Sequence, residues 1–280
     1  ASRPPLLQAD PGWLTATEAI GWPLYPKEDT RFPKVEAMLS KIWRTLMQKH
    51  EVLRKTGFID WGCKPFLHNA YSRWFRISSL SDYGLRRHVW GLYARSGERH
   101  YYEYGTRFNR FAGDWHLAHW TAGRKRKGEF TQGNISLPLH WGSKTDIPLQ
   151  GPTGHDILNW LLEYYFTGDA YALKLARMHG DALRKAWDPQ RVEETDMIIY
   201  GILNIATSLY TMEWDPAYRR IAKRLAEEVI TLDNPNGLTD KRRNGAMYKV
   251  ERNLLMLYDY YCATDDETAR KAILKAVDYK

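Results

Sequence analysis

The segment RFNRFAGDWHLAHWTAG, residues 107–123, combines ionisable and aromatic side chains at close spacing. On a helix, residues three and four apart are neighbours, so His116, His119 and Trp120 share one face. Two imidazoles beside an indole, with Arg107 one turn or more before them, could act as a base or bind a carboxylate in a cleft. The alternative is a pair of partly buried, hydrogen-bonded imidazoles that have only a structural role.

Two other interpretations of this segment stay open. The spacing of His116 and His119 would allow both imidazoles to chelate a metal, but the glutamate of the usual zinc-protease helix motif is absent. Arg110 and Asp114 are four residues apart and would form a simple salt bridge on another face of the helix.

A second candidate segment is SLPLHWGSKTDIPLQGPTGHDILNW, residues 136–160. We expect a helix to begin after Gly154, which places His155 in its first turn. The positive end of the helix dipole favours a neutral imidazole there, and a neutral imidazole can accept a proton. In the alternative, Thr153 or Asp156 caps the helix and the histidine is incidental.

Turn-rich stretches hold the remaining polar and aromatic candidates. Asn69 and Tyr71 occur in WGCKPFLHNAYSRWF, and His140 and Trp141 occur in the second candidate segment. Each stretch follows or precedes a turn, where functional groups are common. We therefore expect these four side chains to contribute to the same site as the histidines.

Composition favours an anionic or carbohydrate partner. The 280 residues carry a net charge of +8, which suggests nucleic acid, acidic polysaccharide or a membrane surface as partner, with a basic protein that has no such partner as the alternative. The 12 Trp and 18 Tyr suit stacking on sugar rings, although a tightly packed helical core would also use them. The basic run GRKRKGEF could bind an anion or be a solvated loop. No nucleic-acid-binding signature and no apolar run long enough to span a membrane is present, so we expect neither partner.

The chain reads as an extended N-terminal segment, residues 1–33, followed by a helical domain, residues 34–280. Apolar residues at helical spacing predict a helix over residues 34–50. The first residue is not Met and the C-terminal pattern is helical up to Lys280, so we expect the chain to be part of a larger protein.

Four similar stretches organise the helical domain. In each, a Tyr near the end of one helix is followed by a short turn, an acidic residue and a second amphipathic helix. The acidic residues are Glu98, Asp169, Asp215 and Asp265, which we expect to cap the second helix or to meet its dipole. Serial αα-hairpins of this kind bury one helix of each pair inside. They predict an all-α fold, an α/α toroid, with an open helical solenoid as the alternative.

Several of these segments resemble bacterial polysaccharide lyases of the exo-rhamnogalacturonan lyase type. The resemblance rests on LPLHWG, on GHDILNWLLEYYFTGD, on GDWHLAHWTAG, and on FIDWG with HNAYS, and it covers roughly residues 57–190. It implies a central α/α toroid, complete or incomplete, flanked by β-rich domains of the same polypeptide. It also implies a secreted or periplasmic bacterial enzyme.

The resemblance implies β-elimination on a uronic acid polymer. A side chain must neutralise the sugar carboxylate, a base must remove the neighbouring proton, and an acid must protonate the leaving oxygen. Proton transfer is assigned to His116, His119, His155 and Tyr71, and substrate binding to Asn69, Arg107, Trp120, His140 and Trp141. No cofactor is required, and a structural or catalytic calcium is left open.

This sequence departs from the family where HNAYS replaces a segment like NNEYD, which leaves the substrate open. A toroid glycoside hydrolase is the competing enzyme class, and it would need two carboxylates across a cleft. Its candidates are Asp60, Asp114 and Asp156. A non-catalytic glycan-binding scaffold is the third class.

Overall fold

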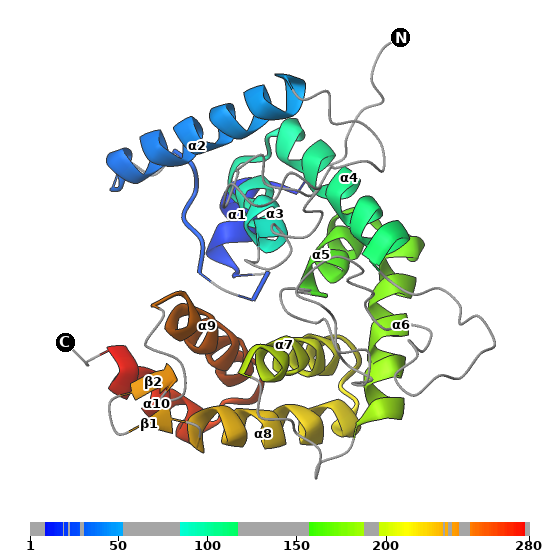
Figure 1. The fold of residues 1–280 in the computed structure, drawn as a ribbon. Coiled ribbons are helices and arrows are strands. Elements are labelled where there is room, and N and C mark those ends of the chain that lie inside the picture. Colours follow the sequence, from blue (N-terminus) through cyan, green and yellow to red (C-terminus); the bar gives the residue numbers. More distant parts are fainter. Residues whose placement is uncertain are drawn as a thin grey trace, which may run out of the picture. The chain divides into compact units, whose positions relative to one another are not determined.

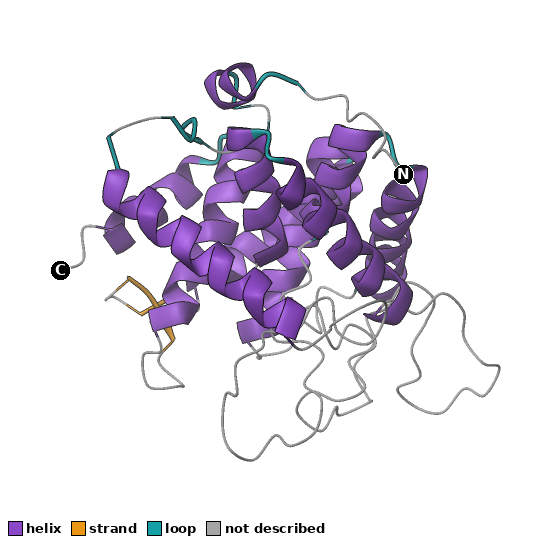
Figure 2. Cartoon of the chain, turned by 90° about the horizontal axis from the view of Figure 1, so that it is seen from above, coloured by secondary structure: helices purple, strands orange, loops and turns teal. Residues whose placement is uncertain are grey.

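The computed structural model describes residues 9–18, 20–21, 23–28, 31–52, 85–116, 157–187, 196–231, 233–234, 237–240 and 247–277. Helices dominate these residues (Figure 2), which confirms the all-α prediction. The chain divides into two compact units. The first contains residues 1–116, 137–143 and 159–172, and the second contains residues 117–136, 144–158 and 173–280.

The helices follow one another along the chain in the order that Figure 1 labels. The first five are α1 (Pro11–Ala16), α2 (Pro33–Val52), α3 (Leu85–Ser96), α4 (Arg99–His116) and α5 (Leu158–Thr167). The next five are α6 (Ala170–Ala186), α7 (Asp196–Glu213), α8 (Pro216–Thr231), α9 (Met247–Thr264) and α10 (Glu267–Val277). Strands β1 (Asp233–Asn234) and β2 (Gly237–Asp240) pair antiparallel, with Asp233 opposite Asp240.

The N-terminal part differs from the extended segment that the sequence predicts. Helix α1 lies within it, because Asp10 accepts a hydrogen bond of 2.8 Å from the backbone N–H of Trp13 and a proline occupies the first turn. The helix expected over residues 34–50 is confirmed as α2. No helix in the described part of the chain is long and apolar enough to cross a membrane.

Arg95, at the end of α3, connects the N-terminal part of the first unit with helices α2 and α3. Its guanidinium donates to the carbonyl oxygen of Tyr25 at 2.7 Å, to that of Pro26 at 3.3 Å and to both carboxylate oxygens of Glu36 on α2, at 2.5 and 3.1 Å. The side chain of Arg95 is only 11% exposed. One buried cation therefore holds an irregular segment and a helix together.

Four short turns join the helices in pairs, α3–α4, α5–α6, α7–α8 and α9–α10. Each turn contains a residue with positive φ whose N–H donates to the carbonyl oxygen of a tyrosine four residues earlier, at 2.7–2.8 Å. The pairs of positive-φ residue and tyrosine are Gly97 and Tyr93, Gly168 and Tyr164, Trp214 and Tyr210, and Asp265 and Tyr261. This bond closes the end of the first helix, so the four hairpins share one turn geometry.

An acidic residue follows the positive-φ position in all four turns. Asp169 accepts from the N–H of Tyr171 at 2.8 Å, and Asp215 accepts from the N–H of Ala217 at 2.7 Å. At the last turn the prediction was wrong by one residue. Asp265 is the left-handed residue that ends α9, and Asp266 caps α10.

The two helices of a hairpin are buried differently. Residues 202–210 of α7 are all buried, as are residues 159–163 of α5. In contrast, α8 buries one stripe, made of Tyr218, Ile221, Ala222, Leu225, Ala226 and Val229. A helix that is apolar all round belongs inside, and an amphipathic one covers it. This is the inside–outside pairing that the sequence predicts.

Two glycines within helices permit close packing. A Cβ on Gly105 of α4 would lie 3.0 Å from Cε2 of Trp90, which is fully buried in the first unit. A Cβ on Gly180 of α6 would lie 2.3 Å from Cδ1 of Leu209 and 2.7 Å from the hydroxyl of Tyr218 in the second unit. A side chain at Gly105 would require the indole to give way slightly, and one at Gly180 would require Leu209 and Tyr218 to shift.

Candidate functional site

Most residues of the predicted site lie outside the described residues. These are Asn69, Tyr71, His119, Trp120, His140, Trp141 and His155, together with Asp60 and Asp156 of the alternative hydrolase. Arg107 is exposed on α4. His116 is the last residue of that helix, and only its backbone belongs to the described part of the structure. Helix α5 begins at Leu158, later than the expected start after Gly154. Whether these residues converge stays a prediction.

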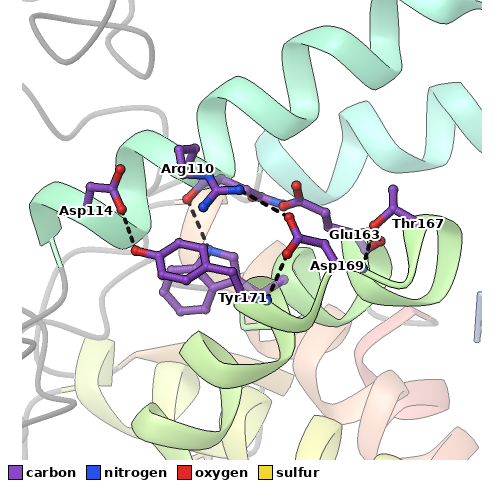
Figure 3. Close-up of polar contacts among 8 residues, drawn as sticks. Arg110, Asp114, Glu163, Thr167, Asp169 and Tyr171 are labelled. Carbon is purple, nitrogen blue, oxygen red and sulfur yellow. Dashed lines mark hydrogen bonds and ion pairs between the residues drawn. The ribbon is translucent and has the colours of Figure 1, made fainter. Parts of the chain in front are cut away.

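The described residues of the first unit instead bring together six polar side chains, which we call the α4–α5 polar cluster. It consists of Asn109, Arg110 and Asp114 from α4, Glu163 from α5, Asp169 from the following turn and Tyr171 from the first turn of α6. Figure 3 shows Arg110 beside Asp169 and the ring of Tyr171 reaching Asp114, with Glu163 on the neighbouring helix.

Asn109 and Glu163 form the buried half of the cluster. The side-chain amide of Asn109 donates to Oε2 of Glu163 at 2.9 Å and to the carbonyl oxygen of Asn159 at 2.8 Å. The indole N–H of Trp160 donates to the carbonyl oxygen of Asn109 at 3.2 Å. Since both amide protons of Asn109 are engaged, its orientation is fixed, and Oδ1 is a buried acceptor without a hydrogen-bond partner in the described structure.

Glu163 is a carboxyl group in an apolar surrounding. Its residue is 3% exposed, and burial raises the pKa of the carboxyl group to about 7. The hydrogen bond from Asn109 lowers this pKa, the charge of Asp169 raises it and that of Arg110 lowers it, but burial is the largest cause. Glu163 therefore exchanges its proton close to neutral pH, as groups in catalytic sites often do.

The exposed half of the cluster corrects one expectation. Arg110 donates to Oδ2 of Asp169 at 3.2 Å instead of pairing with Asp114, and its Cζ lies 4.3 Å from the ring centroid of Tyr171. Asp114 accepts a short hydrogen bond from the hydroxyl of Tyr171. The hairpin turn brings these partners next to α4, and this contact between segments replaces the bond within the helix.

The protonation of Tyr171 follows from its surroundings. Burial raises the pKa of the hydroxyl, and the hydrogen bond to Asp114 raises it further. The phenol is therefore neutral and donates a proton in its hydrogen bond at neutral pH. In this state Tyr171 can act as a hydrogen-bond donor or an acid but not as a base.

Sequence reasoning missed Glu163 and Asn109. A signal for Glu163 was present, because it is the single charged residue in the apolar run ILNWLLEYYF. Asn109 carried no comparable signal, since its partner is fifty-four residues away along the chain. Among the described residues no three His, Cys, Asp or Glu side chains are grouped as a metal site would require.

Comparison with known proteins gives no match, whether with protein-family models, curated proteins or solved structures.

Proposed function

We propose that the chain is a polysaccharide lyase that cleaves an acidic, uronic acid-containing glycan by β-elimination. The repeated hairpin carries this proposal. Four pairs of helices are joined by the same turn, and in the α7–α8 pair a buried helix is followed by an amphipathic one. Such repeats suit the α/α toroid that the sequence resemblance implies. Closure of the repeats into a toroid is part of the proposal.

The chemistry is proposed from residue types. Asn69 and Arg107 hold the sugar carboxylate, which makes the neighbouring proton more acidic. His116, His119, His155 and Tyr71 transfer protons, and Trp120, Trp141 and His140 contact the sugar rings. The net charge of +8 suits a polyanionic substrate. Arg107 and His116 lie on α4, the helix that also contributes to the polar cluster. Their position supports a site beside that cluster.

As part of the same proposal, the protein is secreted or periplasmic in a bacterium and acts beside β-rich flanking domains. It requires no cofactor for proton transfer, because the carboxylate is neutralised by protein side chains. A calcium ion is compatible with this chemistry as a structural or catalytic addition.

A screen of acidic polysaccharides tests the proposal. β-Elimination creates a double bond conjugated with the carboxylate, so a lyase produces sugars that absorb ultraviolet light, whereas a hydrolase does not. We expect the double variant His119→Ala, His155→Ala to lose this absorbance, while the control His88→Ala, at an exposed position on α3, retains it. Unchanged turnover in the double variant would refute the assignment. Reducing ends without absorbance would identify the alternative hydrolase, and binding without any product would identify a scaffold.

A further inference from the structure

Trp214 occupies an unusual place in the repeated turn. It is the positive-φ residue between α7 and α8, with φ of 55°, where two of the sister turns have glycine and the third has aspartate. A bulky side chain in this backbone region is rare, because its Cβ crowds the backbone. The residue is nevertheless 68% exposed.

Packing within the fold does not explain this choice. The indole ring contacts the ring of Tyr210 at a centroid distance of 5.4 Å and an interplanar angle of 69°, which leaves most of the indole in water. The fold therefore holds an aromatic ring outward at a strained position. Backbone strain combined with exposure is a feature of functional sites.

The chain neighbours of Trp214 are both engaged in ion pairs. Arg177 donates to Glu213 at 3.0 Å, and Arg184 donates to Asp215 at 3.0 Å, so both chain neighbours of Trp214 hold a guanidinium. Cζ of Arg219 lies 5.8 Å from the ring centroid of Tyr210. Asp181 lies close enough to Tyr218 to raise the pKa of its hydroxyl. The two ion pairs on either side of Trp214 in the chain each join one arginine to one carboxylate, so their charges balance.

These features favour a neutral sugar ring as the partner. The apolar face of a pyranose stacks on an indole, and the paired charges offer donors and acceptors to its hydroxyl groups. The centre of a protein interface, in contrast, is depleted of charged residues. Among the described residues of α6–α8, Trp214 is the one large apolar side chain that is exposed.

We propose that Trp214 is a surface platform that binds a neutral sugar ring of the glycan, at a turn that contains none of the predicted catalytic residues. This inference rests on the proposed function for the class of glycan.

Affinity electrophoresis of the full chain in gels containing rhamnogalacturonan tests the platform. We expect Trp214→Gly to weaken retention about five-fold, the loss expected for one aromatic stack. The control Trp13→Ala removes an indole that is 57% exposed on α1 and should leave retention unchanged. Urea unfolding of each variant is measured in parallel, and a loss of retention is interpreted only when the variant is folded. Equal retention of wild type and Trp214→Gly would overturn the inference. A Trp214→Gly variant that changes the oligomeric state of the chain without changing its retention would also overturn it.

The design separates this inference from the lyase proposal. Ultraviolet absorbance of the products reports β-elimination, and retention reports the platform. Retention that depends on Trp214 without any unsaturated product would refute the lyase and keep the platform. Unsaturated products together with retention that does not depend on Trp214 would support the lyase and refute the platform.

Discussion

The side-chain amide of Asn109 donates a hydrogen bond of 2.9 Å to Oε2 of Glu163, which ties α4 to α5 where water is excluded. The contact has an electrostatic consequence. Burial opposes ionisation of Glu163 more strongly than the amide supports it, so the pKa of the carboxyl group rises from 4.5 to about 7. The folded chain thus binds a proton at Glu163 over a pH range in which the unfolded chain has already lost it.

This difference makes stability depend on pH. Between pH 4.5 and 7 the native state binds one proton more at Glu163 than the unfolded state, so the free energy of unfolding falls as pH rises through this window. The full effect is on the order of 3 kcal/mol. Urea unfolding at pH 4.5 and pH 8 should show this fall in the wild type and much less of it in Glu163→Gln, which is neutral throughout.

A second variant checks the cause. Asn109→Leu removes the hydrogen bond that lowers the pKa of Glu163, so the pH range over which stability falls should extend to higher pH than in the wild type. If wild type and Glu163→Gln give parallel profiles, Glu163 does not titrate as the buried contact requires.

The turn between α9 and α10 gives the next prediction. The carboxylate of Asp266 accepts from the N–H groups of Thr268 at 2.9 Å and Ala269 at 3.1 Å, so Asp266→Ala should lower the free energy of unfolding by about 1 kcal/mol. Asp265→Asn is the matched control, because asparagine also tolerates the left-handed backbone, and its effect should stay within about 0.5 kcal/mol. Urea unfolding measures both. An unchanged free energy of unfolding in Asp266→Ala would contradict the capping role of Asp266.

The hairpins could be predicted because their signals are local. Apolar periodicity and a tyrosine followed by a turn and an acid are contained within some twenty residues. This is enough to place paired helices and two of the four expected caps, Asp169 and Asp215. The last cap was misplaced because Asp265 and Asp266 are adjacent acids. Only the backbone shows which of them takes the left-handed conformation. The helix at residues 11–16 was missed because proline and glycine in its first turn are also typical of loops.

The polar cluster could not be predicted, because its contacts join distant segments. Arg110 and Asp114 satisfy the four-residue rule for a helical salt bridge, yet each finds a better-placed partner more than fifty residues later. The pKa of Glu163 likewise depends on how deeply α5 is buried. The apolar run in the sequence indicates that α5 is buried but not how deeply. Apart from His116, the last residue of α4, the predicted histidines and Tyr71 lie outside the described residues, so their convergence stays a prediction.

Gly168 offers a clean measure of backbone strain. Its φ is 70°, and a Cβ at this position would meet nothing within 4 Å. Gly168→Ala should therefore lower the free energy of unfolding by about 1 kcal/mol through conformation alone. Gly180→Ala, at a tightly packed position, should cost about 1–3 kcal/mol by overpacking Leu209 and Tyr218. A neutral Gly168→Ala in urea unfolding would contradict the left-handed turn.

Arg95 should control the docking of the N-terminal part. Arg95→Lys keeps the charge but loses the planar fork that contacts Tyr25, Pro26 and Glu36 together, so we expect a loss of about 2 kcal/mol. Limited proteolysis should cut residues 23–36 faster in this variant. Arg99→Lys is the control, because Arg99 pairs with Glu103 inside α4 and its side chain is 34% exposed. Equal cleavage of wild type and Arg95→Lys would show that other contacts hold the segment.

A pair of substitutions at Trp214 isolates the strain at the proposed platform. Trp214→Gly and Trp214→Ala remove the same indole and the same contact with Tyr210, so packing losses cancel in their comparison. Alanine keeps a Cβ at a φ of 55°, whereas glycine does not, and glycine should be more stable by about 1 kcal/mol in urea unfolding. Because strain depends on the backbone and retention on the ring, both variants should lose retention in rhamnogalacturonan gels equally. A glycine variant no more stable than the alanine variant would mean that the turn relaxes and that Trp214 sits there without strain.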